Sequence, residues 1–111
     1  MDKQSRRAAK EAFQKRDASA GIYLIRCTTS DEVWVGKTRN LGAIWNRMSF
    51  AAVNDPLISK SFRAAWGAHG ESAFSFEVLE VMPEDLPAAF MNSTLKERMD
   101  FWKLAHSAEL I

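Results

Sequence analysis

The chain has 111 residues, 47% hydrophobic and 26% charged, a composition that predicts one globular domain with a modest core and excludes a disordered segment. Its single cysteine excludes an internal disulfide and a cysteine-rich metal site, and no apolar run reaches the roughly 18 to 20 residues that span a bilayer. The net charge of +1 is unevenly distributed: residues 1–70 carry 12 basic and 6 acidic residues (+6), whereas residues 71–111 carry 3 and 8 (−5), so a polyanion would meet the first two-thirds of the chain.

The first segment, residues 1–19, is predicted to form a basic helix ahead of a globular domain over residues 20–111. Lys3, Arg7 and Lys10 share one face of this helix at helical spacing. The segment has no apolar stretch of the kind found in secretory signals, so we expect a cytoplasmic protein without membrane contact.

Two β-strands follow, over the segments GIYLIRC (residues 21–27) and EVWVG (residues 32–36). Both are rich in β-branched and aromatic residues, and the second ends at Gly36. The linker between them is polar and about five residues long, which predicts a β-hairpin.

Two helices are expected after the hairpin. Asn40 can cap the first, which runs to about Val53. The Asp-Pro pair at residues 55–56 is a helix start signal, so the second helix is predicted to follow it directly and to end near Gly70.

A third strand is predicted over residues 72–81, where apolar and polar side chains alternate. A short helix over residues 84–90 is expected next, and a last helix over residues 92–110, capped by Ser93 or Thr94. This order predicts an α/β (α+β) fold, with a small three-stranded antiparallel sheet flanked by helices.

Four sequence blocks, in this order, resemble the GIY-YIG nuclease superfamily. They are GIY at residues 21–23, WVG at 34–36 followed by GKTRNL, the stretch WGAHGESAFSFEVLE at 66–80, and ERMDFW at 97–102. The resemblance covers residues 21 to about 105 and leaves out the basic N-terminal helix. It implies a GIY-YIG-like fold and, in the family, metal-assisted cleavage of a phosphodiester.

The resemblance places few of the family's polar active-site residues in this chain. The first tyrosine matches Tyr23, but the second falls on Trp34 in the WVG triplet. The family's arginine falls on Ile44, a frequent histidine on Met48, and the metal-binding glutamate on Met99.

These replacements predict an apolar cleft, because each exchanges a polar group for an apolar one of similar bulk. The cleft is expected to contain Trp34, Gly36, Ile44, Met48 and Met99. A thioether is too soft to hold Mg²⁺, so we expect no metal and no other cofactor. If catalysis survives, Tyr23 would carry it with Arg47, three residues after Ile44, and Mg²⁺ or Mn²⁺ would then be required.

Three hypotheses follow for the function. The first is a non-catalytic module that binds nucleic acid or another partner through a degenerate nuclease site. The second is a divergent metal-dependent endonuclease. The third is a small-ligand or protein-binding module that uses the apolar cleft. For the first, the expected nucleic-acid contacts are Lys37, Arg39, Arg47, Lys3, Arg7 and Lys10.

Overall fold

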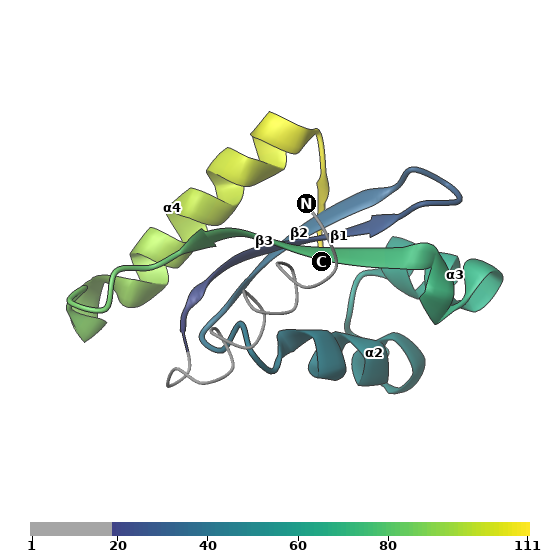
Figure 1. Ribbon diagram of the computed structural model, residues 1–111, viewed down its shortest axis with the longest axis horizontal. Helices are drawn as coiled ribbons and strands as arrows, with labels where there is room; N and C mark the ends of the chain where they lie inside the picture. Colours follow the sequence, from purple (N-terminus) through teal and green to yellow (C-terminus); the bar gives the residue numbers. More distant parts are fainter. Residues whose placement is uncertain (1–18) are drawn as a thin grey trace, which may run out of the picture.

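The computed structural model describes residues 19–111, so the basic helix predicted before the domain lies outside the described residues. Three helices and a four-stranded mixed sheet form the described part, which has the expected α+β class (Figure 1). The strands are β1 (Gly21–Cys27), β2 (Val33–Thr38), β3 (Phe74–Val81) and β4 (Glu109–Leu110), arranged in the order β3-β1-β2-β4. The helices are α2 (Ile44–Asn54), α3 (Lys60–His69) and α4 (Ala88–His106), with a single 3₁₀ turn, η1, at Glu71–Ala73.

The predicted hairpin is confirmed. β1 and β2 pair antiparallel across a five-residue loop, and Tyr23 lies directly opposite Gly36 in the register. β3 pairs antiparallel with the other edge of β1, with an irregularity between Ile22 and Tyr23. β1 is therefore an inner strand, and it is buried on both faces because helices cover both sides of the sheet.

Side-chain alternation on β1 and β2 divides the core into two layers. On one face, Tyr23, Ile25 and Trp34 pack against α2 and α3. On the other face, Ile22, Leu24 and Val35 pack against α4. Of the helices in residues 19–111, Figure 1 shows α2 and α3 on one side of the sheet and α4 on the other.

All three helix starts differ from the sequence prediction. α2 begins at Ile44 after Ala43, without a side-chain cap, so the expected cap by Asn40 is wrong. α3 begins at Lys60, because the Ser59 side chain accepts a hydrogen bond from the Phe62 N–H and caps the helix there, whereas Asp55 closes a turn by accepting from the Leu57 N–H. α4 begins at Ala88, directly after Pro87. A residue before proline is disfavoured in the helical region, so the predicted short helix over residues 84–90 does not form and its last residues belong to α4.

The C-terminus also differs, because the last predicted helix ends early and a fourth strand follows. Ser107 adopts a left-handed conformation (φ 50°) that stops α4. Glu109 and Leu110 then pair in parallel with Trp34 and Val35 of β2, which makes the sheet mixed and four-stranded. This strand covers the middle of the β2 edge and leaves the end from Gly36 to Arg39 uncovered by it.

The contact between Tyr23 and Gly36 requires a residue without a side chain on β2. A Cβ atom placed on Gly36 would lie 2.4 Å from the Tyr23 hydroxyl oxygen and 2.6 Å from Cγ2 of Ile111. Such distances are far inside van der Waals contact, so the tyrosine ring occupies the space that a β2 side chain would otherwise take.

We expect Gly36→Ala to lower the free energy of unfolding by about 1 to 3 kcal/mol, the usual cost of overpacking a well-filled core. Urea denaturation measures this change. Gly67→Ala is the control, because a Cβ added there meets nothing within 4 Å. The substitution also replaces a glycine inside a helix, which should raise the free energy of unfolding by up to about 1 kcal/mol. Equal changes in the free energy of unfolding for the two variants would show that Tyr23 does not need the space above Gly36.

Candidate functional site

A pocket of about 530 Å³ opens at the uncovered end of β2, where helices from both faces of the sheet reach the same edge. We call it the edge pocket. Its β-sheet wall is the Gly36–Arg39 segment, with Tyr23 behind it on β1. From α2 it receives Ile44, Arg47 and Met48, and from α4 it receives Asn92, Leu95 and Met99. Ile58, Leu110 and Ile111 complete the lining.

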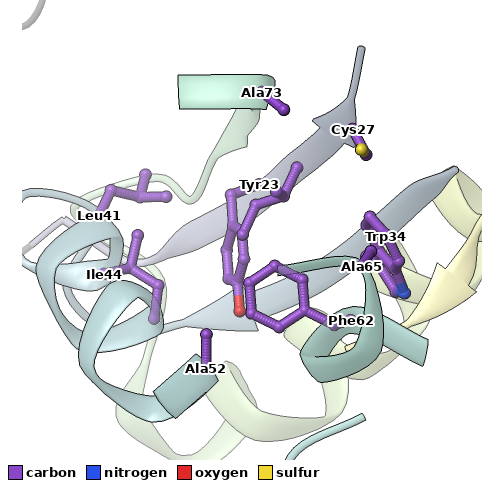
Figure 2. Packing of buried hydrophobic residues seen from close by; sticks show 10 residues of the cluster. Tyr23, Cys27, Trp34, Leu41, Ile44, Ala52, Phe62, Ala65 and Ala73 are labelled. Carbon is purple, nitrogen blue, oxygen red and sulfur yellow. The ribbon is translucent and has the colours of Figure 1, made fainter. Parts of the chain in front are cut away.

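The back of the pocket is the Tyr23 side chain, which is only 2% exposed. Its ring stacks on Phe76 with the centroids 5.8 Å apart, and its hydroxyl donates to Sδ of Met48 at 3.6 Å. Figure 2 shows the ring among Ile44 and other buried residues of α2 and α3. A thioether is a weak acceptor, so a stronger acceptor entering the pocket could replace it.

Burial strongly raises the pKa of Tyr23, and the positive charge of Arg47 opposes this shift only in part. The phenol is therefore a neutral donor at physiological pH. It can give a hydrogen bond to an oxyanion but cannot act as a base there.

The rim of the pocket is basic. Lys37 lies at the end of β2, Arg39 follows the strand, and Arg47 comes from α2; all three are exposed. Arg39 Nη2 also donates to Oδ1 of Asn92 at 2.5 Å, which links the β2 end to α4. Fixed positive charge therefore lines the pocket mouth from two elements.

The floor of the pocket is apolar. Ile44, Leu95 and Met99 supply it, and Ile44 and Leu95 are nearly fully buried. Among the described residues that line the pocket, none is an aspartate or a glutamate. The donor set is a poor match for Mg²⁺ or Mn²⁺, which prefer hard oxygen ligands, because Met99 offers only a thioether.

Trp34 lies outside the edge pocket, so its predicted place in the cleft is wrong. The indole is fully buried between α3 and the sheet, with its ring centroid 5.4 Å from that of Phe62. Its Nε1 donates to Oγ of Ser61 at 2.9 Å, and that hydroxyl donates in turn to Oε2 of Glu109 at 2.7 Å. The ring thus connects the core to α3 and β4.

The remaining predicted cleft residues, Gly36, Ile44, Met48 and Met99, all line the edge pocket. So do Lys37, Arg39 and Arg47 from the predicted nucleic-acid contacts, whereas Lys3, Arg7 and Lys10 lie outside the described residues.

From α4, sequence reasoning assigned only Met99 to the cleft and missed the other two residues that line the edge pocket. Asn92 and Leu95 stand seven and four residues before Met99, a helical spacing that could have placed them on the same face. Leu110 in β4 and Ile111 directly after it gave no such signal, because a two-residue strand has no recognisable period.

Comparison with solved structures shows the fold. The chain is similar to the catalytic domain of the homing endonuclease I-TevI, a GIY-YIG enzyme, with a TM-score of 0.68 and 23% identity over 83% of this chain and 97% of that one. A mutant of the same catalytic domain, described as an intron endonuclease, matches with the same TM-score and 24% identity over 80% of this chain and 84% of that one. No family model matches the chain, and no curated protein matches it.

The chain therefore has a GIY-YIG-like fold, as the four sequence blocks predicted. Among the helices of residues 19–111, none combines the length and the apolar content that a membrane crossing needs.

Tyr23 is the single tyrosine of the chain, so its ionisation can be followed alone by the absorbance of tyrosinate. In the folded chain, we expect the Tyr23 hydroxyl not to ionise near pH 10, the usual pKa of tyrosine, because burial raises its pKa. The unfolded chain releases this proton above about pH 10 while the folded chain keeps it, so stability should be unaffected below that pH and fall above it.

A spectrophotometric titration from pH 8 to pH 12, followed in parallel by circular dichroism, tests this expectation. Tyrosinate should appear only together with unfolding. Ionisation near pH 10 in a chain that is still folded would show that the hydroxyl is open to solvent.

Proposed function

We propose that this protein is a GIY-YIG-fold module that binds nucleic acid at the edge pocket and that its nuclease site is degenerate. The observation that carries the proposal is the charge pattern of the pocket. Three exposed cations surround it and no aspartate or glutamate side chain lines it, so its ligand should be an anion.

A phosphate group suits this pocket by geometry as well as by charge. Arg39 and Arg47 come from different elements and can approach one phosphate from two sides. The neutral Tyr23 hydroxyl can donate to a phosphate oxygen in place of its weak bond to Met48. The similarity to an endonuclease domain supports a nucleic acid as the carrier of that phosphate.

The same pocket is poorly equipped to cleave the phosphodiester. Ile44 stands where the resemblance places the family's arginine, and an arginine aimed at a transferring phosphoryl group is worth on the order of 10³ to 10⁵ in rate. Met99 stands where it places the metal-binding glutamate. Losing the cation as well removes several kcal/mol of stabilisation of the transition-state charge.

We expect binding to be mainly electrostatic and to depend little on sequence, because nothing at the pocket is suited to reading base edges in a groove. The double variant Arg39→Glu/Arg47→Glu should lower the affinity for a labelled oligonucleotide at least tenfold, measured by fluorescence anisotropy. Native affinity should also fall steeply between about 50 and 200 mM salt.

The matched control is Lys60→Glu/Lys96→Glu, which changes the net charge by the same amount at two exposed lysines outside the pocket lining. It should weaken binding only slightly. If both double variants lose affinity equally, or if salt has no effect, the edge pocket is not the phosphate site. The apolar floor would then favour a small-ligand or protein partner.

We expect no cleavage of single-stranded DNA, double-stranded DNA or RNA in the presence of Mg²⁺ or Mn²⁺, since the two most important charges of the family's site are replaced. A gel-based cleavage assay, run beside Tyr23→Phe, measures this. Cleavage by the native protein that disappears in Tyr23→Phe would support the divergent-endonuclease hypothesis, in which Tyr23 acts with Arg47.

A further inference from the structure

A second hollow of about 580 Å³ lies on the outer side of α2, next to the edge pocket. We call it the α2 hollow. Arg47 and Met48 line both, so the two meet at one turn of the helix. The α2 hollow continues past Phe50 and Ala51 to the end of the helix, near Asp55 and Pro56.

Phe50 is the chemically unusual residue of this hollow. Its side chain is 69% exposed, and it belongs to neither of the two core clusters. Phe50 stands three residues after Arg47, and residues at this spacing in a helix have Cβ atoms about 5 to 6 Å apart. An exposed aromatic ring therefore stands one helical turn from a cation on the pocket rim.

The charges of the α2 hollow differ from end to end. Arg47 lies where it joins the edge pocket, and Asp55 lies at the far end, where one carboxylate oxygen accepts from the Leu57 N–H. A carboxylate repels phosphate, so a bound strand would place its phosphate near Arg47 and a neutral group over Phe50. The neutral group of a nucleotide that has a flat aromatic face, and can therefore stack on a ring, is its base.

We propose that the α2 hollow takes an unpaired base of a single-stranded nucleic acid, stacked on Phe50, while the adjoining phosphate binds at Arg47. This rests on the proposed function and adds a substrate class to it. Proteins that bind single strands combine a basic groove with aromatic stacking platforms, and the joined hollows supply one of each. In a duplex the faces of the bases are stacked on one another, so a duplex cannot use the ring.

Three probes separate stacking from charge: labelled oligo-dT, a labelled DNA duplex, and inorganic polyphosphate as a polyanion without bases. Phe50→Ala should weaken binding of oligo-dT about tenfold, as expected for the loss of one base–aromatic stack. It should leave binding of the duplex and of polyphosphate unchanged. Phe50→Trp should keep or increase the affinity for oligo-dT, because the larger ring still stacks.

The control variant is Phe90→Ala, which removes a phenylalanine that is 58% exposed on α4 and lines neither hollow. It should change no affinity. Unchanged oligo-dT binding by Phe50→Ala would overturn the single-strand inference while leaving phosphate binding at Arg47 intact. Equal weakening of all three probes would overturn it too, since stacking cannot affect a polyanion without bases. If the native protein binds none of the three probes, the proposed function is refuted as well.

Discussion

The structure depends on one close contact, the Tyr23 ring lying over Gly36. The two residues face each other on adjacent strands, and the ring fills the place of the missing β2 side chain. The hydroxyl therefore lies over β2, and Tyr23 lines the edge pocket while its ring stays buried. A larger residue at position 36 would force the ring away and close the pocket from behind.

The edge pocket combines properties that a solvated surface would not have. Its floor of Ile44, Leu95 and Met99 excludes water better than a polar floor, and charges at the edge of a low-dielectric region act more strongly on an anion than charges on an open surface. The same floor is stable without a ligand, because each of these side chains is apolar and leaves no buried polar atom unpaired. An arginine at position 44 would need a partner for its charge in this buried place.

α4 packs on the sheet through its buried apolar stripe and makes polar contacts on both sides of that stripe. Oε1 of Glu80 on β3 accepts from Nε of Arg98 and from Nε1 of Trp102, each at 2.8 Å. The pair with Arg98 is partly exposed, so its own contribution to stability is small. Its geometric effect is larger: with the Arg39–Asn92 bond, it fixes the rotation that turns Leu95 and Met99 toward the pocket and the sheet.

The sequence by itself determined the hairpin, the three main strands, the presence of the two helices after the hairpin and the fold family that they resemble, because these depend on local periodicity and on short motifs. It did not show that the two helices share one face of the sheet. The resemblance to the GIY-YIG superfamily also placed Gly36, Ile44, Met48 and Met99 in one cleft, because residues that match a family's active-site positions lie close together in its fold. Only the tertiary structure decided where Trp34 points, since its indole N–H could find Ser61 only once α3 had packed on the sheet. The same holds for β4 and for the link between Arg39 and α4, because Glu109 and Leu110 pair with β2 and Arg39 meets Asn92 across more than fifty residues of chain. Contacts of that separation have no local pattern, so only the folded chain shows them.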